Sequence, residues 1–180
     1  MAPMDLKTKL IDRLKKTLPP RILLGKFCFP DGRQGIYADP NYISFFYYLG
    51  SELKPKCMAE FDCEIGIRAA CCALGSKDTK ISLFLEGVSR FADANVRLAG
   101  VKPNVYVGKL TERTLELIEE SWNLVIVRNV EFLNVIWNKV PHGGVVCMVG
   151  KDQAFHDFCK SKNREPIVFQ VRDGVILIER

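Results

Sequence analysis

The chain has 180 residues, of which 48% are hydrophobic and 26% charged, which is enough for one well-buried core and little more. Its formal net charge of +5 is modest and indicates solubility rather than nucleic-acid binding. Seven cysteines without a C-x-x-C pair, and the lack of a secretory signal or an apolar run of about 20 residues, predict a reduced, cytoplasmic chain without a membrane segment.

Two helices are predicted before residue 57. Apolar residues at helical spacing over 5–18, with lysines and arginines among them, predict a basic amphipathic helix that Pro19-Pro20 ends. Asp39-Pro40 is typical of a helix start and predicts a second helix over 41–53. This second helix carries a cluster of rings typical of a core or an interface, and it is a candidate contact for a homo- or hetero-oligomer. The rings are those of Phe45, Phe46, Tyr47 and Tyr48.

From residue 58 the chain alternates short apolar runs with amphipathic stretches, the pattern of a mostly parallel sheet with helices on both faces. The predicted strands are 58–64, 80–86, 104–107, 123–128, 144–149, 166–171 and 175–179, and the predicted helices are 69–74, 89–98, 111–121, 131–139 and 152–162. Only Arg172-Asp173-Gly174 separates the last two strands, which predicts a hairpin and an antiparallel final strand. We interpret residues 1–57 as a helical N-terminal cover of one α/β domain over 58–180.

The turn after the first predicted strand carries the strongest functional signal. Glu64-Ile65-Gly66 follows an apolar run, and Glu86 ends the next strand twenty residues after the glycine. An acidic residue at such a strand end can bind ribose hydroxyls beside a glycine turn. A phosphate-cradling loop would have further glycines, but Arg68 and Ala70 follow here. The spacing therefore predicts a nucleotide-type site with a reduced glycine motif.

These features together resemble the class I S-adenosylmethionine-dependent methyltransferases over roughly residues 58–180. The chain is most similar to the small-molecule O-methyltransferase branch and the cephalosporin-hydroxylase-like proteins, in which the motif E-I-G-x-x-x-G-x-S opens the domain. Here that stretch is Glu64-Ile65-Gly66-Ile67-Arg68-Ala69-Ala70-Cys71-Cys72. Further matches are Asn95 in the next helix, Trp122-Asn123-Leu124-Val125-Ile126-Val127 against the family's F-D-L-V, and Pro141-His142-Gly143-Gly144-Val145-Val146 against its P-G-G-V.

The resemblance implies a three-layer, Rossmann-like methyltransferase fold, S-adenosylmethionine as cofactor and a small-molecule or sugar-type methyl acceptor. It implies that Gly66 lets the chain pass the methionine part of the cofactor, that Glu64 orients the amino group and that Glu86 binds the ribose hydroxyls. The full set of predicted cofactor-binding residues is Glu64, Gly66, Arg68, Glu86, Gly87, Gly108, Lys109 and Arg128.

Two departures from the family pattern concern the chemistry. Gly108-Lys109 stands where the family has G-D, and Arg128-Asn129 stands where it has an aspartate for metal or substrate. We therefore predict no metal site and assign no catalytic residue. Tyr37, Tyr47 and Asp152 are candidates for a base only because their segments could cover the site.

Other functions stay open at this point. Arg68, Lys109, Arg128 and Lys151 follow successive predicted strands, and converging cations would attract an anionic ligand such as a phosphate, a nucleotide or an acidic substrate. The chain would then be a catalytically inactive methyltransferase-like module that binds or assembles, for example within a virion or a larger complex, with an anion-binding crevice. A dinucleotide-binding Rossmann domain is a third alternative, which the missing glycines and the terminal hairpin disfavour.

Overall fold

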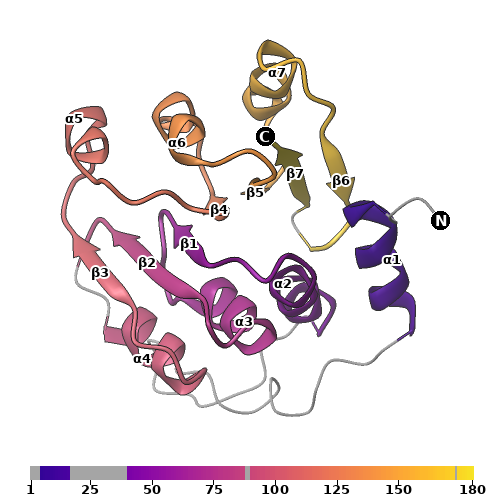
Figure 1. Cartoon of the computed structure of the whole chain (residues 1–180), viewed down its shortest axis with the longest axis horizontal. Helices are drawn as coiled ribbons and strands as arrows, with labels where there is room; N and C mark the ends of the chain where they lie inside the picture. The colour runs from indigo at the N-terminus through magenta and orange to yellow at the C-terminus, as the bar shows by residue number, and fades with distance from the viewer. Residues whose placement is uncertain (1–4, 17–39, 88–89, 173) are drawn as a thin grey trace.

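The computed structural model describes residues 5–16, 40–87, 90–172 and 174–180 (Figure 1). Seven strands form one sheet in the order β3-β2-β1-β4-β5-β7-β6. Their bounds are β1 Cys57–Glu60, β2 Lys80–Leu85, β3 Asn104–Val107, β4 Leu124–Val127, β5 Val145–Val149, β6 Ile167–Phe169 and β7 Val175–Glu179.

The first five strands run parallel, with Met58 of β1 paired to Ile81 of β2 and to Leu124 of β4. Strand β7 lies between β5 and β6 and is antiparallel to both. The predicted α/β sheet with a C-terminal antiparallel hairpin is therefore confirmed. Its strand order reverses direction between β1 and β4, because the chain continues from β1 toward β2 and β3, and from β4 toward β5.

Helices cover both faces of the sheet, so the molecule has three layers (Figure 1). Helices α1 (Leu6–Lys16), α2 (Pro40–Leu53), α3 (Ile67–Gly75) and α4 (Arg90–Leu98) contribute to one hydrophobic cluster. Helices α5 (Glu112–Glu116), α6 (Leu133–Lys139) and α7 (Gln153–Ser161) contribute to a second cluster on the opposite face. None of the helices in the described ranges is long and apolar enough to cross a bilayer.

Helix α2 packs closely on α3 through glycines. A Cβ atom at Gly50 would lie 2.3 Å from the carbonyl oxygen of Cys72, and one at Gly75 would lie 2.2 Å from that of Tyr47. Most rings of the aromatic cluster are buried on this helix, and Phe45 and Phe46 are fully inaccessible to solvent. These rings therefore build the core of a single chain, and the oligomer contact stays a prediction. The predicted start of α2 at Asp39 lies outside the described residues.

Two predicted elements end at least four residues too late, for local reasons, and the other predicted bounds differ from the observed ones by smaller amounts. The strand predicted over 58–64 ends at Glu60, because Asp62 adopts a left-handed φ of 51° that no strand continues through. Thr111 caps α5 as a helix-start residue does, but the helix predicted over 111–121 ends at Glu116. After α5 the chain no longer forms a helix, and Glu120 anchors this connection to the sheet. The Glu120 carboxylate accepts hydrogen bonds from Ser82 Oγ of β2 at 2.7 Å and from Trp122 Nε1 at 3.2 Å.

Candidate functional site

A cleft with a volume of about 610 Å³ lies at the carboxyl ends of β1, β2 and β4. Parallel sheets bind ligands at this edge, at the point where the strand order reverses. Here that point is the boundary between β1 and β4, since α3 follows β1 on one face and α6 follows β4 on the other. The described residues that line the cleft are Asp62, Cys63, Glu64, Leu85, Glu86, Gly87, Arg128 and Asn129.

The loop between β1 and α3 is held by both neighbouring strands. The Phe61 amide donates to the carbonyl oxygen of Ile126 in β4 at 2.8 Å, and the Cys63 amide donates to that of Phe84 in β2 at 3.2 Å. Asp62, between them, has the left-handed backbone. These two main-chain hydrogen bonds therefore fix the position of Asp62, the first residue of the loop with a carboxyl group at the cleft.

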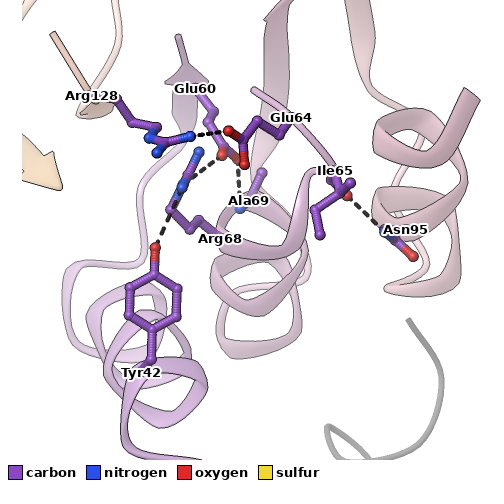
Figure 2. A network of polar contacts seen from close by, with 8 residues as sticks. All are labelled: Tyr42, Glu60, Glu64, Ile65, Arg68, Ala69, Asn95 and Arg128. Carbon is purple, nitrogen blue, oxygen red and sulfur yellow. Dashed lines mark hydrogen bonds and ion pairs between the residues drawn. The ribbon is translucent and has the colours of Figure 1, made fainter. Parts of the chain in front are cut away.

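Two side-chain bridges join the loop after β1 to the loop after β4. The Arg128 guanidinium donates to the Glu64 carboxylate, and the Asn129 amide donates to the Asp62 carboxylate. The first bridge is open to solvent, because the Arg128 side chain is 41% exposed and that of Glu64 is 68% exposed. Figure 2 shows Arg128 and Glu64 pointing toward one another. Both bridges span the boundary between β1 and β4.

The cleft is acidic. Among the described residues that line it, the carboxyl groups of Asp62, Glu64 and Glu86 face one guanidinium, that of Arg128. Burial raises the pKa of Asp62, and the nearby charge of Glu86 adds to this effect, while Arg128 and the Asn129 hydrogen bond oppose it. A cation entering the cleft would be attracted, and a polyanion would be repelled.

A buried ion pair lies behind the cleft. Glu60, at the end of β1, is fully buried, and its carboxylate accepts from Arg68 Nε at 2.7 Å and from the Ala69 amide at 2.9 Å (Figure 2). The second bond satisfies an amide in the first turn of α3, where a helix lacks internal partners and favours negative charge. Arg68 Nη1 also donates to the Tyr42 hydroxyl at 3.4 Å. This network connects β1, α2 and α3 inside the molecule.

The backbone conformation and the packing at position 66 both require a glycine. Its φ is 67°, and a Cβ atom there would lie 2.7 Å from the carbonyl oxygen of Ala92 in α4. Asn95 of α4 donates to the carbonyl oxygen of Ile65 at 2.7 Å and holds the same turn (Figure 2). The turn between β1 and α3 is therefore packed directly against α4. Passage of a cofactor over Gly66 stays a prediction.

The structure distributes the eight predicted cofactor-binding residues over three places. The cleft is lined by four of them: Glu64, Glu86, Gly87 and Arg128. An adjacent cavity of about 40 Å³, which shares Glu64 with the cleft, is lined by Gly66 and Arg68. The last two, Gly108 and Lys109, follow edge strand β3 and line neither.

The four predicted cations do not converge. Arg68 is buried against Glu60, and the Lys151 side chain lies along Gly174, with its Cγ 3.0 Å from where a Cβ there would stand. Neither these two nor Lys109 is among the described residues that line the cleft. Arg128 alone of the four lies there, so the structure removes the basis for an anion-binding crevice.

Sequence reasoning missed the places of Glu60 and Asp62: Asp62 lines the cleft, and Glu60 forms the buried ion pair behind it. Both fall inside an apolar run that reads as one strand, and the signal was the presence of carboxylates within that run. Of the three candidates for a base, Tyr37 lies outside the described residues. Tyr47 packs edge-to-face against Tyr48. Asp152 caps α7 through the Ala154 amide at 2.7 Å.

Comparisons with known proteins identify the fold. No family model matches the sequence, and no curated protein sequence matches it. Solved structures do match. A methyltransferase from Podospora anserina, bound to S-adenosylhomocysteine, aligns with a TM-score of 0.63 at 18% identity and covers 99% of this chain and 97% of its own. An O-methyltransferase from Bacillus cereus, in complex with the same molecule, aligns with a TM-score of 0.63 at 14% identity over 100% of this chain and 93% of its own.

A third structure is an O-methyltransferase from Streptomyces achromogenes involved in tomaymycin synthesis, in complex with S-adenosylmethionine. It aligns with a TM-score of 0.65 at 15% identity and covers 79% of this chain and 81% of its own. The chain has the class I methyltransferase fold. The methyltransferase fold predicted from the E-I-G turn and the terminal hairpin is thereby confirmed. In this methyltransferase fold the acidic cleft occupies the ligand-binding edge of the sheet.

Proposed function

We propose that the chain is a methyltransferase that binds S-adenosylmethionine in the cleft between the ends of β2, β1 and β4. The observation that carries the proposal is the meeting of Glu64 and Glu86 in one cleft of about 610 Å³. This volume lies in the range of about 300 to 1,000 Å³ that is typical of small-ligand sites. The fold shared with cofactor-bound methyltransferases supports the same assignment.

The charges of the cleft suit this cofactor. S-adenosylmethionine carries a sulfonium and an ammonium, and three carboxyl groups line the described part of the cleft against one guanidinium. Glu86 directly follows β2 and is exposed, so its two oxygens can accept hydrogen bonds from neighbouring ribose hydroxyls. A polyphosphate nucleotide would meet the same carboxylates as a repulsive surface. The cleft therefore favours a sulfonium nucleoside over a dinucleotide.

The reaction we propose is an in-line displacement at the sulfonium methyl, for which positioning of the acceptor supplies most of the catalysis. The methyl moves from sulfur to an oxygen of a small-molecule or sugar-type acceptor, sulfur keeps the electron pair of the broken bond, and the acceptor releases a proton. Asp62 is the candidate to receive that proton, because it lines the cleft and burial raises the pKa of its carboxyl toward the working range of a base. Asn129 would orient the carboxyl through its amide.

Calorimetric titration with S-adenosylmethionine and S-adenosylhomocysteine tests the proposal. Wild type should bind, and Glu86→Ala should weaken binding about 10- to 100-fold, the effect of losing hydrogen bonds to a charged group. Glu119→Ala is the matched control, because Glu119 is an exposed glutamate in the connection that enters β4 at the opposite edge of the sheet. At a hundredfold excess over its dissociation constant, the cofactor should also stabilise the fold by about 2.7 kcal/mol.

Two results would contradict the proposal. Binding of neither cofactor form would remove it and leave the inactive binding or assembly module as the working function. Equal affinities of Glu86→Ala and Glu119→Ala would place the cofactor outside this cleft. ATP serves as the comparison ligand and should not bind.

A further inference from the structure

The Arg128 and Glu64 pair occupies a defined place in the cleft. Arg128 directly follows β4, Glu64 lies in the loop after β1, and these strands are neighbours in the sheet. Their side chains form an ion pair in the cleft wall (Figure 2). At 41% and 68% exposure, both groups remain hydrated, so exchanging this pair for contacts with a ligand costs little desolvation.

A guanidinium next to a carboxylate is complementary to an α-amino acid. The ammonium of such a ligand matches the carboxylate, and its carboxylate matches the planar guanidinium, which binds carboxylates in bidentate fashion. The neighbouring arginine cannot take this part, because Arg68 is buried and paired with Glu60. Among the described residues that line the cleft, Arg128 is the one cation.

The spacing of the strands fits one extended ligand. Glu86 follows β2, and β2, β1 and β4 are successive strands in the sheet. Neighbouring strands lie about 4.8 Å apart, so a nucleoside held at β2 leaves the amino-acid end about 5 to 10 Å away, beside Glu64 and Arg128. We infer that Arg128 is the receptor for the carboxylate of the cofactor's amino-acid end, with Glu64 receiving the ammonium. This inference rests on the proposed function and adds a specificity-determining residue to it.

The inference predicts discrimination by a single group of the ligand. Decarboxylated S-adenosylmethionine keeps the nucleoside, the sulfonium and the amine but lacks the carboxylate. Wild type should bind S-adenosylmethionine about 10- to 100-fold more tightly than the decarboxylated form, since the contact at stake is a charge-assisted hydrogen-bond pair. In Arg128→Met this preference should fall to within about threefold, because the ligand carboxylate then has no cationic partner, while the ammonium that both ligands share still meets Glu64.

Calorimetric titration of both ligands into wild type, Arg128→Met and Arg164→Met is the experiment. Arg164 is an exposed arginine before β6, outside the cleft, and its variant should keep the wild-type preference. Retained affinity of Arg128→Met for the decarboxylated ligand shows that the variant is folded with an intact nucleoside site. A wild-type preference that persists in Arg128→Met would overturn the inference and leave the proposed function standing. Binding of neither ligand to wild type would overturn both.

Discussion

The buried pair of Glu60 and Arg68 makes the sharpest prediction about stability. Replacing Arg68 by Met keeps an unbranched chain of similar length but removes the charge. The Glu60 carboxylate, with none of its side chain exposed, would then retain the Ala69 amide but lose its counter-ion. Removing one partner of a buried ion pair costs about 3 to 5 kcal/mol, because the remaining charge stays in a medium of low dielectric.

This loss is large for a domain of this size. Globular proteins are stable by about 5 to 15 kcal/mol, so Arg68→Met should lose about a fifth or more of a typical margin. At about 2 to 4 °C per kcal/mol for domains of 150 to 250 residues, the melting temperature should fall by about 6 to 20 °C. Adding Glu60→Gln to this variant should restore part of the lost stability, because the glutamine side chain still accepts a hydrogen bond from the Ala69 amide without burying a charge.

Urea unfolding at pH 7, followed by the fluorescence of buried Trp122 and Trp137, measures the change. Arg97→Met is the matched control, since Arg97 makes an equally short ion pair with Asp93 at 2.6 Å while its side chain is 49% exposed. The control should leave the unfolding midpoint nearly unchanged. The reasoning is refuted if Arg68→Met behaves like Arg97→Met, or if Glu60→Gln destabilises the Arg68→Met variant further.

Two further predictions concern the turn and the cleft. Gly66→Ala should destabilise the fold by at least about 1 kcal/mol more than Gly100→Ala, as measured by urea unfolding. Both glycines have a positive φ, but of the two only Gly66 lacks space for a Cβ atom, which would clash with the backbone of Ala92. Equal losses of stability would contradict this packing argument. Burial raises the pKa of Asp62 in the folded state, so the stability linked to its protonated form is complete below the unfolded pKa of about 3.9 and is lost as the pH rises through the folded pKa. Asp62→Asn should therefore melt above wild type at pH 7, with the difference shrinking toward pH 4, and a difference independent of pH would contradict this.

Local sequence was sufficient for much of the fold. Three residues between two apolar runs cannot make a crossover, so the hairpin of β6 and β7 followed from the spacing alone. Thr111 caps α5, and Gly100 has the left-handed φ of 86° expected of a residue after a helix, because both depend on the chain within one turn. Positions of Glu64 and Glu86 at the ligand edge also followed, since the carboxyl ends of parallel strands share one edge.

The partners of the charged residues were decided by the tertiary structure. Arg68 and Arg128 look alike in the sequence, as cations after strands, yet one is buried against Glu60 and the other faces the cleft. That difference arises because α3 begins directly after Gly66 and turns Arg68 toward the end of β1, which no local pattern encodes. The insertion of β7 between β5 and β6 is likewise a long-range pairing. Sequence periodicity specified which segments form strands and helices, and contacts between distant segments specified which charges remain available to a ligand.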